Sequence, residues 1–163
     1  SDMYSRSDMY TPSEHHIPEY TQIFRTGIIE ALWTLPFVSA AKKQEYRIPS
    51  ALFEDGLINS TYYYLTRLND LGIQPPLYIM LTLIHISEFK MLLMNNEGTS
   101  KFDKDIIIIP ETTINNNNED VSKIMKESFD IIWNSVGVKG SIYYDKDNNR
   151  IDTSQLWRSK YYM

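Results

Sequence analysis

The stretch from residue 65 to residue 94 places the tightest limits on the fold. Leucines spaced along one helical face end at Gly72, a residue that commonly terminates a helix in the left-handed conformation. Pro75-Pro76 then forms a stiff corner. The next residues read Leu-Tyr-Ile-Met-Leu-Thr-Leu-Ile-His-Ile, which predicts a long strand from Leu77 to about Met94, apolar on both faces and buried. The chain therefore contains a helix that turns back onto a buried strand.

Three segments carry a helical pattern of apolar residues. The first, residues 18 to 35, opens at Pro18 and has apolar residues three and four positions apart. The second, residues 50 to 71, is expected to begin at an N-cap serine, Ser50. The third, residues 121 to 136, has the clearest stripe, and Asn115 to Asn118 with Asp120 are expected to cap it. Residues 37 to 50 are expected to form an irregular basic connector.

Two further segments favour strands. Ile106 to Ile109 is bounded by Asp105 and Pro110, which predicts a central strand antiparallel to the strand at 77 to 94. A turn-rich insert at 145 to 149 predicts a hairpin. The sum is an α+β domain, about three helices packed on a small, mostly antiparallel sheet. We expect a single domain over residues 17 to 163, preceded by a flexible arm at residues 1 to 16.

Composition narrows the function. The 163 residues carry a net charge of −5 and contain no cysteine, which argues against disulfides and thiolate chemistry and favours a reducing, cytoplasmic compartment. No apolar run is long enough for a membrane span, so no membrane contact is expected. A free-standing nucleic-acid binder usually presents a basic patch. The nearest cluster is Lys42, Lys43 and Arg47, which we treat as a solvated loop with phosphate contact as the alternative.

No constellation of residues indicates a catalytic, metal or cofactor site. His15-His16 precedes Pro18 and lacks the spacing of helical zinc ligands, so a helix-entry pair is expected. Asp145 and its neighbours lack the glycine and glutamate that a calcium loop needs. His85 is expected to lie in the core. The alternative is a nucleotide- or nucleic-acid-dependent enzyme with a pocket near His85, lined also by Arg25 and Glu30. We predict no catalytic residue, no metal and no cofactor.

Several blocks, in conserved order along residues 10 to 152, carry a family resemblance. They are residues 14 to 31 (EHHIPEYTQIFRTGIIEA), 48 to 50 (IPS), 71 to 76 (LGIQPP), 106 to 111 (IIIIPE), 129 to 134 (FDIIWN) and 141 to 145 (SIYYD). These blocks resemble the C-terminal region of bacterial proteins whose N-terminal half is a Schlafen-type, AlbA-like domain. Such proteins are classed as DNA-binding, as ATP-binding or as transcriptional regulators.

The resemblance implies that DNA or nucleotide binding belongs to the N-terminal domain of a parent protein, so no functional residue is carried over to this chain. We therefore expect a non-enzymatic accessory domain that serves self-association or partner contacts. Its partner would be a second copy, as a homo-oligomer, or the N-terminal DNA-binding domain, with DNA contacted only through that domain. Exposed aromatic residues favour interfaces, and the expected interface residues are Tyr4, Tyr10, Trp157, Tyr161 and Tyr162.

Overall fold

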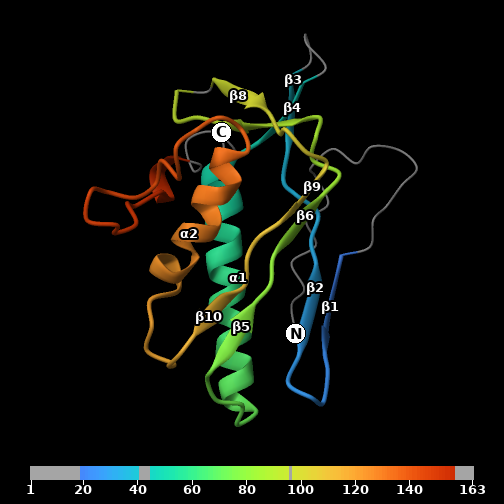
Figure 1. The fold of residues 1–163 in the computed structure, drawn as a ribbon, viewed down its shortest axis with the longest axis vertical. Helices are drawn as coiled ribbons and strands as arrows, with labels where there is room; N and C mark the ends of the chain where they lie inside the picture. The colour runs from blue at the N-terminus through green and yellow to red at the C-terminus, as the bar shows by residue number, and fades with distance from the viewer. Residues whose placement is uncertain (1–18, 41–44, 96, 157–163) are drawn as a thin grey trace. The chain divides into compact units, whose positions relative to one another are not determined.

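The chain forms two compact units. The computed structural model describes residues 19–40, 45–95 and 97–156 (Figure 1). The first unit extends to Thr34 and the second begins at Leu35. The expected arm at residues 1 to 16 lies outside the described residues.

The described part of the first unit, residues 19 to 34, is a β-hairpin, and the prediction of a helix over residues 18 to 35 is wrong. Strand β1 (Tyr20–Ile23) pairs antiparallel with β2 (Ile29–Leu32). The amide of Gly27 donates to the carbonyl of Phe24, and Gly27 has a φ of 86°. A three-residue loop that ends in a left-handed glycine is a common hairpin connection. Tyr20 and Ile23 stand three positions apart on β1, as do Ile29 and Leu32 on β2, and this spacing mimics a helical stripe.

Two helices form one layer of the second unit, α1 (Ser50–Asp70) and α2 (Val121–Asn134). Both end in the same way, as the sequence predicts. The amide of Ile73 donates to the carbonyl of Leu68 in α1, and the equivalent bond at the end of α2 runs from Val138 to Trp133. The glycines between, Gly72 and Gly137, have φ values of 79° and 80°. Each helix end is therefore a Schellman motif, which satisfies the last carbonyls.

The helix starts differ from the predicted ones. Pro49 occupies the N-cap of α1, with no side-chain cap bond, so the prediction of Ser50 as N-cap is wrong. The Ser50 hydroxyl instead donates to the carbonyl of Leu92. At α2 the N-cap is Asp120 itself, whose carboxylate accepts from the Ser122 amide at 2.9 Å.

A long two-stranded ribbon forms the second layer. Strands β5 (Leu77–Ile79) and β6 (Thr82–Ile84) pair antiparallel with β10 (Thr112–Ile114) and β9 (Ile106–Ile108). Between the paired positions Ile79↔Thr112 and Thr82↔Ile108 lie two residues on one strand and three on the other. The extra residue is a bulge next to Pro110, a position where a strand tolerates proline.

The antiparallel pairing of Ile106 to Ile109 with the preceding strand is confirmed. The predicted length of that preceding strand and its predicted burial on both faces are wrong. The strand expected from Leu77 to Met94 is broken into three. The bulge beside Pro110 separates β5 from β6, and a turn at His85, where φ is 57°, separates β6 from β7. Burial on both faces is also wrong. Leu83, Ile107 and Ile109 are buried, whereas their neighbours along each strand point to solvent.

Residues 37 to 50 are not an irregular connector, which is a further correction. They supply β3 (Val38–Ala40) and β4 (Glu45–Ile48). With β7 (Phe89–Leu92) and β8 (Gly98–Lys101) these strands form a four-stranded sheet in the order β3-β4-β7-β8. Strand β4 pairs parallel with β7, and the other pairs are antiparallel.

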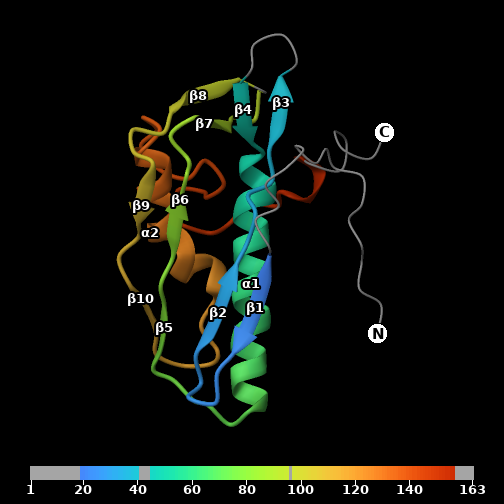
Figure 2. The ribbon, with the colours of Figure 1, turned by 90° about the vertical axis from the view of Figure 1, so that its right-hand side faces the viewer.

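The core of the second unit lies where α1, α2 and the inner face of the ribbon meet. The two helices lie side by side with the ribbon running along them in both views (Figures 1 and 2). Phe53 from α1, Phe129 and Trp133 from α2, and Ile107 from β9 are all buried in one cluster. A short helical segment, residues 154 to 156, follows. The α+β class with mostly antiparallel pairing is confirmed. Among the described residues, no helix has the length and apolarity that membrane crossing requires.

Candidate functional site

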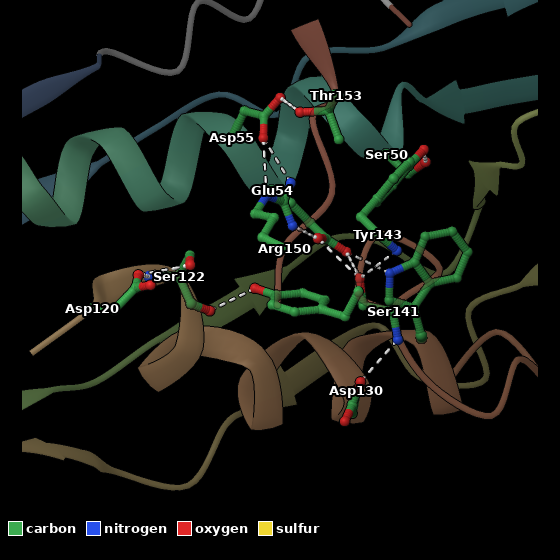
Figure 3. Close-up of polar contacts among 12 residues, drawn as sticks. Ser50, Glu54, Asp55, Asp120, Ser122, Asp130, Ser141, Tyr143, Arg150 and Thr153 are labelled. Atoms are coloured by element: carbon green, nitrogen blue, oxygen red, sulfur yellow. Dashed lines mark hydrogen bonds and ion pairs between the residues drawn. The ribbon is translucent and has the colours of Figure 1, made fainter. Parts of the chain in front are cut away.

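The most polar part of the interior surrounds Glu54, a residue of α1 whose side chain is fully buried. Its Oε1 accepts hydrogen bonds from Trp133 Nε1 at 2.6 Å and from the Ser141 hydroxyl at 2.8 Å. Its Oε2 accepts from Arg150 Nη1 at 2.5 Å (Figure 3). A buried carboxylate is tolerated when it is paired and hydrogen-bonded in this way.

Arg150 joins this carboxylate to the next residue of α1. Its Nη2 and Nε donate to Asp55 Oδ1 at 2.6 and 3.2 Å, and the Thr153 hydroxyl donates to Asp55 Oδ2 at 2.6 Å. The Arg150 side chain is only 11% exposed, and its guanidinium lies within 6 Å of three aromatic rings, those of Phe129, Tyr143 and Tyr144. Cation–π contacts of this kind strengthen when the cation is desolvated.

Residues 141 to 153, which we call the strap, fasten α1 to α2. The Tyr143 hydroxyl lies 2.7 Å from the Ser50 hydroxyl at the start of α1. On the α2 side, the Ser141 amide donates to Asp130 Oδ1 at 2.9 Å and the Tyr144 hydroxyl donates to a backbone carbonyl at 2.6 Å. Figure 3 shows the strap residues between the two helices. The predicted turn at 145 to 149 belongs to the strap and is closed by an antiparallel bridge between Tyr144 and Arg150.

The electrostatics of the cluster follow from burial. Burial raises the pKa of Glu54 above the ordinary carboxyl value, and the bonds from Trp133 and Arg150 oppose that rise. Burial lowers the pKa of Arg150, but its bonds to the two carboxylates outweigh burial, so that pKa is raised. Burial also raises the pKa of Tyr144 to about 12. Both Glu54 oxygens accept hydrogen bonds from donors within the chain, so the arrangement is a structural ion-pair network. We call the contacts of Arg150 with Glu54 and Asp55 the ionic tie.

His85 is on the surface, so its predicted place in the core is wrong. Its side chain is 76% exposed, and its Nδ1 lies 3.2 Å from Asp105 Oδ2. Ser87 completes the cluster, because its hydroxyl donates to Asp105 Oδ1 at 2.9 Å. That bond is the main cause of the lowered pKa of Asp105. A nucleophilic serine must instead bond the imidazole, so this is not the geometry of a catalytic triad.

The other predicted site residues are spread over the chain. Arg47 is on β4, and its Nη2 lies 2.7 Å from Glu45 Oε2, while Lys90 Nζ lies 3.1 Å from Glu45 Oε1. Arg25 lies in the hairpin turn and Glu30 on β2, both in the first unit.

Several predictions fall on parts of the chain that the structure does not describe. These are the phosphate contacts Lys42 and Lys43, the pair His15-His16, and the interface residues Tyr4, Tyr10, Trp157, Tyr161 and Tyr162. Within the described ranges, histidine and acidic side chains form no group of three that could hold a metal ion.

The feature that sequence reasoning missed is the outer face of the ribbon. Five apolar side chains, four on the strands and Met80 between β5 and β6, are largely exposed: Tyr78 57%, Met80 77%, Ile84 47%, Ile106 53% and Ile108 75%. We call these five residues the outer face. The register aligns Ile84 with Ile106 and Thr82 with Ile108, so the exposed side chains form one continuous strip. The signal in the sequence is two nearly continuous apolar runs, residues 77 to 84 and 106 to 109, and such runs predict burial on both faces.

No family model, curated protein or solved structure matches this chain. The resemblance to the C-terminal region of Schlafen-type proteins therefore stays a prediction.

Proposed function

We propose that this chain is a non-enzymatic accessory domain of a DNA-binding regulator, and that the outer face is the surface through which it makes self-association or partner contacts. The observation that carries the proposal is the exposure of Met80 and Ile108, two large apolar residues of the ribbon that are 77% and 75% exposed. Monomeric soluble proteins rarely leave a continuous apolar strip uncovered unless it binds something.

The size of the outer face supports a binding role. At their observed exposures the five side chains present on the order of 500 Å² to solvent, which lies within the range of the largest patches on monomers, and such patches are often functional. The strip carries no ionisable group apart from the Tyr78 hydroxyl, as expected for the centre of an interface. The link to a DNA-binding regulator rests on the resemblance alone. The net charge of −5 is consistent with DNA contacts in a separate domain.

The proposal is tested by solvent accessibility of isoleucine methyl groups in dilute protein. We expect a soluble paramagnetic probe to broaden the NMR signals of Ile106 and Ile108 strongly and to spare those of Ile107 and Ile109. These four residues are adjacent and chemically identical, so the buried pair is an internal control. If the signals of Ile106 and Ile108 are as protected as those of Ile107, the face is already covered within the folded chain and the proposed function fails.

A further inference from the structure

From the outer face we infer the partner: a second copy of this chain, packed face to face across a two-fold axis. This inference rests on the proposed function, because it requires the outer face to be a docking surface. Three observations favour a second copy, namely the charge of the strip, its area and its register.

The charge of the strip is the first observation. Copies of a chain with a net charge of −5 repel one another, so self-contact costs least where neither surface bears a charge. The side chains of Met80, Thr82, Ile84, Ile106 and Ile108 contain no ionisable group. A charged partner surface would form no ion pair with these side chains, whereas an identical apolar strip would cover them without burying a charge.

The area of the strip is the second observation. Two copies stacked on their outer faces would together bury on the order of 1,000 Å² of apolar surface, which is at the lower end of specific interfaces. A face of this size suits a weak, reversible dimer. It is too small for an obligate assembly, whose interfaces are several times larger.

The register supplies the third observation. In an isologous contact each residue meets its equivalent or a residue placed symmetrically about the axis. Thr82 lies near the middle of the strip, with Met80 two residues before it, Ile84 two residues after it, and Ile108 paired with it on β9. A two-fold axis near Thr82 would place Thr82 of one copy over Thr82 of the other, so the two smallest side chains meet at the axis and the larger apolar side chains pack on either side of it. It would also bring the Tyr78 end of one strip over the Ile84 end of its partner.

The decisive experiment is sedimentation velocity on the full chain from about 1 μM to 1 mM, compared with two lysine variants. We expect the unmodified chain to show a reversible monomer–dimer equilibrium. The variant Ile108→Lys should weaken dimerisation at least about tenfold, because truncating or charging a central side chain removes an interface anchor. Leu71→Lys is the matched control, since Leu71 is 61% exposed at the end of α1, and it should leave the equilibrium unchanged. Isoleucine methyl accessibility checks that each variant is folded.

Cysteine crosslinking tests the two-fold arrangement, and the absence of native cysteine makes every introduced thiol unique. Stacked sheets lie about 10 Å apart, so a bismaleimide of about 8 Å span is suitable. Thr82→Cys should crosslink to itself, Tyr78→Cys should crosslink to Ile84→Cys in mixtures, and Leu71→Cys should do neither.

The possible failures are distinguishable. A monomer at every concentration, with Ile106 and Ile108 still accessible, would overturn the second copy and leave the docking surface of the proposed function standing. A dimer whose dissociation constant is unchanged by Ile108→Lys would show that the outer face is not the interface. A dimer that does not crosslink through Thr82→Cys would overturn the two-fold arrangement.

Discussion

Replacing Arg150 with methionine should destabilise the fold by about 3–5 kcal/mol, the usual cost of leaving a buried charge without its partner. Arg150 donates one hydrogen bond to the fully buried Glu54 and two to Asp55. A bond to a buried charged group contributes about 1.5–3 kcal/mol, and those to the more exposed Asp55 contribute less, so the sum agrees with that range. Methionine retains much of the contact with the neighbouring rings, so the loss reports mainly on the ion pairs.

The assay is urea unfolding followed by tryptophan fluorescence, since Trp133 donates to the same carboxylate. With a slope of about 2 kcal/mol per molar urea, the midpoint should fall by about 2 M. Arg67→Met is the matched control, because Arg67 pairs with Asp70 at 3.3 Å with both side chains about half exposed. Exposed pairs contribute little, so that variant should lose less than about 1 kcal/mol.

The Arg150→Met deficit should also depend on pH in a defined direction. Burial raises the pKa of Glu54 in the folded state, and removal of the cation raises it further. A carboxyl group with a raised folded pKa binds its proton more tightly in the folded state, so its contribution to stability is present at low pH and is lost as pH rises through the folded pKa. The deficit should therefore shrink as pH is lowered from 7 toward about 4. A deficit equal to that of Arg67→Met, or one that does not shrink in acid, would refute the account of the ionic tie.

Two further substitutions test local features, both by urea unfolding. Asp120→Ala removes the N-cap of α2 and should cost about 1 kcal/mol at pH 7, while Asp120→Asn should retain most of it. The pKa of Asp120 is lowered, chiefly by its bond from the Ser122 hydroxyl. The stabilisation by the cap is therefore present above about pH 4 and should be lost as pH falls through the folded pKa of Asp120. A loss of stability in Asp120→Ala that does not change with pH would contradict the cap. Gly140→Ala would place a methyl group 2.7 Å from Asp130 Oδ1 and should cost about 1–3 kcal/mol of stability. Gly72→Ala is the comparison, because its methyl group would meet no atom within 4 Å and the variant adds only about 1 kcal/mol of backbone strain. Equal losses at the two glycines would argue against the close contact.

The sequence was sufficient where a segment has one period and a clear stop. The stripe of α2 and its end at Gly137 were predicted because a single helical face is buried and a left-handed glycine closes it. The hairpin at residues 20 to 32 was missed because its apolar residues, read without the turn, repeat at helical intervals. Arg25-Thr26-Gly27 was the informative signal, since a glycine at the end of a three-residue loop favours a hairpin.

The candidate sites were harder to predict, for two physical reasons. The ionic tie joins Glu54 to Arg150, which are 96 positions apart, and nothing local in either segment selects the partner. A strand that is apolar at every position, such as Ile106 to Ile109, indicates two apolar faces but not whether both are covered within the chain. The sequence therefore predicted the presence of the outer face as apolar surface but not its exposure.

The separation of Glu54 and Arg150 has a consequence for synthesis of the protein. On the ribosome, α1 emerges with a carboxylate destined for a dry environment about 96 residues before the cation that neutralises it. At ordinary elongation rates of about 5–20 residues per second, the helix waits several seconds or more with that carboxylate either hydrated or protonated. Burial of Glu54 as an ionised carboxylate therefore waits for Arg150, which becomes available only after the strap has left the exit tunnel.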